Sequence, residues 1–311
     1  MSSQFCDQGI PANSRIDLRR EIQAFLIDRK TRGLAPGSIK FYRSKLRTAA
    51  RFFESIGITD VAQIRARDVR AMLVTLGENH NPGGLHGIFR AFRTFLYWWE
   101  VETEPKGWSN PLRKVKPPRL DDTPLEPVSL DDLRAMLATC NRKRFYGARD
   151  EAMLLFLLDS GCRRAELHAL NIGDVDLTTG SVHIARGKGG KSRTTFIGSK
   201  TRRAVVRYLR FRAEIAEEEP LWVTSQGKRL RLQSLREVLR RRAKRAGVEA
   251  PTLHSFRRGF AISALRSGCD LITLQRMLGR SSLAIVGRYL RQVEDDLWEA
   301  HERVGPVDHM L

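Results

Sequence analysis

Side chains that could bind and act on a phosphate group occur at several places in the second half of the chain. Arg163 follows the end of an apolar stretch at Gly161, and Glu166 comes one helical turn later. Lys188 lies in the sequence Gly-Lys-Gly-Gly-Lys, where glycine allows the backbone to approach a ligand closely. Because a guanidinium can hold a phosphate through two parallel hydrogen bonds, these segments are candidates for a phosphate site.

The C-terminal third of the sequence holds the remaining candidates. His254 and Arg257 are three residues apart, which places them on one face of a helix. Arg280 follows Leu-Gly, and Tyr289 comes nine residues later. Each segment also has a structural interpretation: an arginine paired with a glutamate at a helix start, a solvated glycine turn, a histidine near a helix cap, and a core tyrosine. Taken singly, none of them identifies a function.

The elements that must position these residues fall into two domains joined by a linker. Apolar residues at helical spacing predict an N-terminal helical domain at 15–110, after a tail at 1–14. Residues 111–127 are rich in proline and basic side chains, which predicts a semi-rigid linker. Residues 128–311 then form a second, larger domain.

The second domain contains both helical and extended patterns. Ser129 begins a capping box, and the strongly apolar stretch 148–159 predicts a core helix. The alternating segments 181–185 and 192–197 flank the glycine turn and predict an antiparallel hairpin. Three further helices are predicted at 252–266, 271–278 and 282–293. The sequence therefore predicts a mainly α fold with a small antiparallel β-sheet.

The charge of the chain indicates a negatively charged partner. The 311 residues contain 55 Lys and Arg against 35 Asp and Glu, which gives a formal net charge of +20. Both halves are basic, with 20 basic and 11 acidic residues up to Pro117 and 35 and 24 after it. The basic residues are spread over folded segments and not gathered in one amphipathic tail, which favours nucleic acid over an anionic membrane surface.

Composition also excludes several classes of protein. The longest run of large apolar residues, Met153–Leu158, is far shorter than a membrane-spanning helix, and the first ten residues lack a signal-peptide core. We therefore expect a cytoplasmic protein without membrane partners. The four cysteines form no CxxC pair, which excludes a disulfide scaffold and a structural zinc site.

The joint pattern of the candidate residues resembles the tyrosine recombinases, the family of phage integrases and Xer-like site-specific recombinases. The resemblance extends from about residue 15 to about residue 295, and the matched positions agree in type, order and spacing. It implies a two-domain clamp with an N-terminal SAM-like core-binding domain and a mixed α/β catalytic domain at 128–311. The matched residues are Arg163, Lys188, His254, Arg257 and Tyr289.

The resemblance implies a covalent mechanism on DNA. Tyr289 would attack a phosphodiester, leaving a 3′-phosphotyrosine bond and a free 5′-hydroxyl, so that one difficult step becomes two easier ones. Arg163 and Arg257 would hold the non-bridging oxygens of the transition state. Lys188 would protonate the leaving oxygen, and His254 would manage the proton at the nucleophile. No metal or other cofactor is implied, because the arginines supply the positive charge.

Two further residues complete the expected site. Glu166 would hold neighbouring side chains without reacting itself. Arg280 departs from the family pattern, in which most members have His, or sometimes Trp, after Leu-Gly. Arginine can donate a hydrogen bond to a phosphate oxygen but cannot act as a base at neutral pH. We therefore expect Arg280 to stabilise the phosphate, with activity retained but slower.

Basic clusters in both domains predict how duplex DNA is held, although a solvated helix face is the alternative for each. The expected phosphate contacts are Lys40, Arg43, Lys45, Arg47, Arg90, Arg93, Arg236, Arg240, Arg241 and Lys244.

The resemblance also implies an oligomer. The C-terminal segment around Leu297 and Trp298 would dock into a neighbouring subunit, forming a dimer on one site and a homotetramer on two duplexes. Packing of this segment on its own domain is the alternative.

These features predict a site-specific recombinase that integrates, excises or resolves mobile DNA or resolves chromosome dimers. One alternative is a DNA-binding accessory protein of the same fold that lost catalysis through Arg280. A covalent protein–DNA adduct that disappears in Tyr289→Phe would distinguish the enzyme from this alternative. A second alternative is an enzyme like the type IB topoisomerases, which would relax supercoiled plasmid without a specific site.

Overall fold

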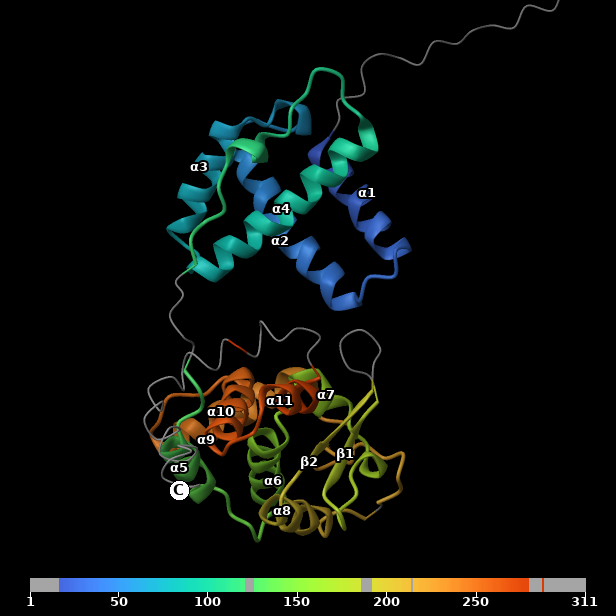
Figure 1. The fold of residues 1–311 in the computed structure, drawn as a ribbon, viewed down its shortest axis with the longest axis vertical. Coiled ribbons are helices and arrows are strands. Elements are labelled where there is room, and N and C mark those ends of the chain that lie inside the picture. Colours follow the sequence, from blue (N-terminus) through green and yellow to red (C-terminus); the bar gives the residue numbers. More distant parts are fainter. Residues whose placement is uncertain (1–16, 121–125, 186–191, 214, 280–286, 288–311) are drawn as a thin grey trace, which may run out of the picture. The chain divides into compact units, whose positions relative to one another are not determined.

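The computed structural model describes residues 17–120, 126–185, 192–213, 215–279 and 287. The chain divides after Thr123 into two compact units (Figure 1). Each unit has its own apolar core. This division lies inside the segment that the sequence predicts as a linker.

The N-terminal unit is the predicted set of helices, packed around an aromatic core. Asn81 caps the longest helix by accepting from the Gly84 N–H at 2.7 Å. Phe53 stacks on Phe92 of this helix with ring centroids 5.2 Å apart. The helices of the unit are α1 (Leu18–Thr31), α2 (Pro36–Ser55), α3 (Ala66–Gly77) and α4 (Pro82–Thr103), with the 3-10 turns η1 (Val61–Gln63) and η2 (Pro111–Lys114).

The first residues of the predicted linker pack into this unit. Leu112 of η2 and Val115, which directly follows η2, are buried in its core. Arg113 pairs with Glu100 at 2.7 Å, and Arg70 donates to the main chain of η2. The proline at the start of η2 therefore begins a packed turn, and residues 111–115 belong to the N-terminal unit.

The second unit is built around α6, with α8 and α10 packed against it (Figure 1). The helix predicted at 282–293 lies outside the described residues apart from position 287. Within the described part of the chain, no helix is both long enough and apolar enough to cross a membrane. The helices of the unit are α5 (Leu130–Ala138), α6 (Phe145–Ser160), α7 (Arg164–Ala169), η3 (Ile172–Asp174), α8 (Ser199–Leu209), α9 (Leu232–Ala246), α10 (Leu253–Arg266) and α11 (Leu271–Leu278).

Strands β1 (Ser181–Ile184) and β2 (Arg193–Phe196) form the predicted antiparallel pair. Ile184 lies opposite Arg193, which places Arg193 at the start of β2. Burial alternates along β2, so that Arg193 and Thr195 are more buried than the residues that follow each of them. Thr195 Oγ1 donates to the Ser160 carbonyl at 2.8 Å and thereby ties β2 to the end of α6.

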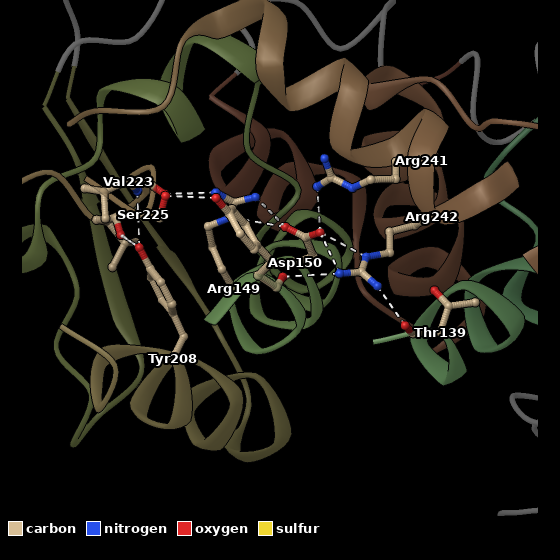
Figure 2. A network of polar contacts seen from close by, with 10 residues as sticks. Thr139, Arg149, Asp150, Tyr208, Val223, Ser225, Arg241 and Arg242 are labelled. Carbon is tan, nitrogen blue, oxygen red and sulfur yellow. Dashed lines mark hydrogen bonds and ion pairs between the residues drawn. The ribbon is translucent and has the colours of Figure 1, made fainter. Parts of the chain in front are cut away.

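A buried carboxylate, Asp150 of α6, joins several elements of the second unit (Figure 2). Arg149 donates to Asp150 Oδ1 through Nε and Nη2, at 3.1 and 2.8 Å. Arg241 and Arg242 of α9 reach Asp150 Oδ2 from the other side, each at 2.9 Å. Arg242 also donates to the Thr139 carbonyl after α5 at 2.7 Å. The network therefore fixes α5, α6 and α9 to one another through buried charges.

Candidate active site

The turn between α6 and α7 sets the position of Arg163. Gly161 ends α6 with a left-handed φ of 58°, and a Cβ there would lie 2.5 Å from Phe260 Cδ1 of α10. Both the conformation and the close approach require glycine. The Ser160 hydroxyl accepts from the Cys162 N–H at 3.3 Å and closes the turn. The chain then enters α7 with Arg163 as its capping residue.

Arg163 is held by Glu166 and by the end of α11. Its Nη1 donates to Glu166 Oε1 at 2.6 Å, and its main-chain N–H donates to Glu166 Oε2 at 2.7 Å. Its Nη2 donates to the Gly279 carbonyl at 2.9 Å. Burial by itself would raise the pKa of Glu166, but hydrogen bonds from Arg193 and Arg163 outweigh it and lower that pKa below its usual value. Glu166 is therefore a charged carboxylate that orients Arg163.

Arg257 approaches the same place from α10. The Thr252 hydroxyl caps this helix by accepting from the Ser255 N–H at 3.0 Å. Arg257 is 1% exposed, donates from Nη1 to the Gly161 carbonyl at 2.8 Å, and donates from Nη2 to the Leu278 carbonyl. The predicted arginines 163 and 257 therefore meet at two consecutive carbonyls at the end of α11.

A third arginine, which the sequence analysis did not single out, contacts the same helix end. Arg193 of β2 donates from Nε to the Met277 carbonyl at 2.9 Å and from Nη2 to Glu166 Oε2 at 3.0 Å. The last carbonyls of a helix carry partial negative charge and have no partner within the helix, so they attract cations. The one sequence signal for Arg193 is its place on the more buried face of a short strand.

The other predicted site residues are placed only in part. His254 is exposed in the first turn of α10, three residues before Arg257. Lys188, Arg280 and Tyr289 lie outside the described residues. In the sequence, Lys188 lies between β1 and β2, and Arg280 directly follows the Gly279 carbonyl that accepts from Arg163. The described part of the site thus contains the two predicted phosphate-binding arginines and the glutamate that supports one of them.

Cys162 lies next to Arg163 but is unsuited to be a nucleophile. It is 1% exposed, and burial raises the pKa of its thiol to about 11. A thiol with this pKa is almost entirely protonated at neutral pH and therefore unreactive.

Two basic grooves in the N-terminal unit contain most of the contacts predicted there. Lys40, Arg43 and Arg47 line a groove of about 560 Å³ together with Lys30. A second groove, of about 670 Å³, is lined by Arg90 and Arg93 of α4 with Arg29, Arg32 and Tyr97. Arg29 and Lys30 lie on α1 and Arg32 directly follows it. The sequence analysis missed all three, because their spacing alone does not show which helix faces them.

Lys45 differs from the other predicted contacts on α2. It is half-buried, and its Nζ donates to the Gly84 carbonyl at 3.3 Å. Its stem also packs beside Gly87 of α4. Its ammonium group therefore helps to join α2 to α4, and the prediction that it faces a ligand in the same way as its neighbours is not supported.

The basic residues of α9 have two different environments. Arg236, Arg240 and Lys244 are exposed and four residues apart, so they lie along one face of the helix. Arg241 instead donates to the buried Asp150 (Figure 2). Its prediction as a phosphate contact overlooked this carboxylate, which lies far away in the sequence.

Comparison with known proteins identifies the family of the chain. Residues 127–295 match the model of the phage integrase family, and residues 22–84 match that of the phage integrase N-terminal SAM-like domain. A tyrosine recombinase XerC of Pelobacter propionicus is 29% identical over 297 residues, which cover 93% of this chain and 96% of the relative. A tyrosine recombinase XerC of Chromohalobacter salexigens is 30% identical over 277 residues, covering 88% and 91%.

Solved structures share the fold. A lambda integrase tetramer bound to a Holliday junction has a TM-score of 0.72 at 14% identity, covering 89% of this chain and 78% of that one. XerH recombinase in a post-cleavage complex with its difH substrate has a TM-score of 0.69 at 17% identity, covering 93% and 90%. With the family matches over both units and the paired arginines of the site, the chain belongs to the phage integrase family of tyrosine recombinases, enzymes that cleave and rejoin DNA.

Proposed function

We propose that this chain cuts and rejoins duplex DNA at a specific site through a 3′-phosphotyrosine intermediate formed by Tyr289. The observation that carries the proposal is the meeting of Arg163 and Arg257 at the carbonyls of Leu278 and Gly279. This point lies ten residues before Tyr289 in the sequence. Two guanidiniums brought together from separate helices offer paired donors to one phosphate group.

The residues around this point have distinct roles in the proposal. Arg163 and Arg257 stabilise the charge that develops on the non-bridging oxygens, where loss of one well-placed donor costs about 10²-fold or more in rate. Lys188 protonates the leaving 5′-oxygen, and His254 manages the proton of the attacking phenol, whose ordinary pKa is about 10. Arg280 donates to the phosphate without acting as a base.

The proposed partner is duplex DNA carrying a recombination site. The basic grooves of the N-terminal unit and the exposed face of α9 with Arg236, Arg240 and Lys244 provide the positive charge for phosphate contacts. The solved relatives include a lambda integrase dimer on a core site and a tetramer on a Holliday junction. We propose the same assembly here, with a dimer on one site and a tetramer on two.

The proposed cellular role is recombination of bacterial DNA in the cytoplasm at the nucleoid. Relatives named XerC and XerD come from bacteria and match most of the chain. Two roles fit the proposal, recombination of mobile DNA and resolution of chromosome dimers. A single well-defined site on the host chromosome would indicate the second role.

The test is formation of a covalent protein–DNA adduct. The binding site is first recovered by selecting duplexes from a randomised pool with the Tyr289→Phe variant, which retains every proposed DNA contact apart from one hydroxyl. A nick is then placed near the cleavage position, so that cleavage releases a short fragment that dissociates from the duplex. Religation is thereby prevented, and the covalent intermediate accumulates. Wild type and Tyr289→Phe are compared on denaturing gels, with and without protease.

A protease-sensitive adduct in wild type and none in Tyr289→Phe is the expected result. Tight binding to the selected duplex without an adduct would contradict the proposal and favour a DNA-binding accessory protein, and Arg280→His would then test whether that position abolished catalysis. Relaxation of a supercoiled plasmid that lacks the selected site would contradict site-specific cleavage and favour an enzyme like the type IB topoisomerases.

A further inference from the structure

The Arg193 guanidinium connects the two groups that hold Arg163. Arg163 donates to Glu166 Oε1 and to the Gly279 carbonyl. Arg193 donates to the other oxygen of the same carboxylate, at 3.0 Å, and to the Met277 carbonyl two residues before Gly279, at 2.9 Å. The two arginines therefore share one carboxylate and one helix end, and Arg193 bridges the supports on which Arg163 depends.

The described contacts of Arg193 go to the groups that hold Arg163. Its side chain is 8% exposed and that of Glu166 is 3% exposed, whereas that of Arg163 is 25% exposed. Both Nε and Nη2 of Arg193 are bound to these groups, at the Met277 carbonyl and at Glu166 Oε2. An effect of Arg193 on the reaction would therefore pass through Glu166 and the end of α11.

Arg193 packs closely against Gly279 at the end of α11. Gly279 has a left-handed φ of 57°, and a Cβ there would lie 2.5 Å from Arg193 Cδ. One terminal nitrogen of Arg193, Nη1, is buried without a hydrogen-bond partner among the described residues. Burying a charged guanidinium is costly, so a neutral side chain would serve packing alone at lower cost. The guanidinium is better explained by what it positions.

We propose that Arg193 is a positioning residue for the cleavage reaction. It fixes the Glu166 carboxylate and the C-terminal end of α11 relative to each other, and so holds the Arg163 guanidinium in the orientation in which it donates to the scissile phosphate. The inference rests on the proposed function of Arg163. A displacement of about 1 Å in a group that must be oriented costs about 10²-fold in rate, even when the chemical groups themselves are unchanged.

The test compares three variants of the full chain on the nicked duplex described above. Arg193→Gln removes the charge and shortens the side chain, and Arg193→Lys keeps the charge but cannot bridge two acceptors with a planar fork. Arg212→Gln is the matched control, because Arg212 is also buried and also donates to one carbonyl, of Pro220 at 2.6 Å, and to one carboxylate, of Glu219 at 3.5 Å. The dissociation constant and the first-order rate of adduct formation are measured separately, and thermal unfolding confirms folding.

The expected result is a separation of rate from binding. Arg193→Gln should form adduct about 10²-fold more slowly with little change in the dissociation constant, and Arg193→Lys should fall between it and wild type. Arg212→Gln should match wild type in rate. A folded Arg193→Gln with the rate of wild type would overturn the proposal. If Arg193→Gln does not fold, Arg193→Lys is the deciding variant, and a wild-type rate of adduct formation in Arg193→Lys would overturn the proposal.

A structural measurement separates this inference from the proposed function. In a crystal structure of folded Arg193→Gln, or of Arg193→Lys if the glutamine variant does not fold, the Arg163 guanidinium should have lost its contact with Glu166 or Gly279, whether or not the wild type forms an adduct. An unchanged Arg163 would overturn the positioning role. Absence of an adduct from wild type would instead contradict the proposed function.

Discussion

Replacing Asp150 by asparagine tests the buried network of the second unit with almost no change in shape. The substitution keeps the size of the side chain and one carbonyl oxygen but removes the negative charge that Arg149, Arg241 and Arg242 share (Figure 2). The side chains of Arg149 and Arg242 are 3% and 2% exposed, so solvent cannot replace the lost carboxylate. Two buried cations would remain with carbonyl partners, and Arg149 also with the rings of Phe145 and Tyr146, but among the described residues neither would keep a carboxylate.

The expected loss of stability follows from these contacts. Removing one partner of a buried ion pair costs about 3–5 kcal/mol, because a charge is left uncompensated. The lower end applies here, since Arg149 keeps the Val223 carbonyl, Arg242 keeps that of Thr139, and Arg241 is exposed enough to be hydrated. A loss of about 3 kcal/mol corresponds to a fall of about 6–12 °C in Tm for a domain of 150–250 residues.

The assay is urea and thermal unfolding of the full chain followed by circular dichroism. The control is Asp131→Asn, which removes an ion pair that is even shorter, to Arg134 at 2.6 Å, from an exposed site and should change stability by less than about 1 kcal/mol. If Asp150→Asn and Asp131→Asn unfold at the same midpoint as wild type, the reasoning is refuted, and the three arginines are accommodated without the carboxylate.

Two other predictions concern acid stability and DNA binding. Because folding lowers the pKa of Glu166, its ionisation contributes stability above its unfolded pKa of about 4.3, and this contribution is lost as pH falls through the folded pKa. The free energy of unfolding, measured with urea, should therefore fall less between pH 7 and pH 4 for Glu166→Gln than for wild type. An equal fall in the two proteins would contradict this. In the first basic groove, Arg43→Ala with Arg47→Ala should reduce the slope of log affinity against log salt by about 2. Fluorescence anisotropy over a salt series measures the slope. The control is Lys45→Ala, which should change the slope by less than 1, because the Lys45 ammonium donates to the Gly84 carbonyl. If Lys45→Ala changes the slope as much as each arginine substitution does, the distinction between Lys45 and its neighbours is refuted.

Most helices and the hairpin could be predicted because their causes are local. Apolar residues at helical spacing mark α1 to α4, and the alternating segments on either side of a glycine turn mark β1 and β2. The turn at Gly161 could also be anticipated, since glycine commonly ends helices in the left-handed conformation. The place of Arg163 at the start of a helix, and of Arg257 one turn after His254 on another, followed from the same local rules.

Contacts between distant residues could not be predicted in this way. The apolar stretch at 148–159 predicted a core helix, but nothing nearby shows that Asp150 just inside it binds arginines from α9. The same limit applies to Arg193, whose partners lie on α7 and α11. Prolines predicted a linker from 111 onward, whereas the burial of Leu112 and Val115 depends on a core formed by other helices.

The three arginines at the end of α11 bind main-chain carbonyls of residues 277, 278 and 279, and this has a consequence for how the sequence can change over evolution. A carbonyl is present whatever the side chain, so exposed positions of α11 such as Ile272 and Thr273 can vary without affecting these contacts. The constraint instead falls on Gly279, whose lack of a Cβ lets Arg193 approach. Relatives could therefore diverge along the exposed face of this helix and still keep the same arrangement of arginines.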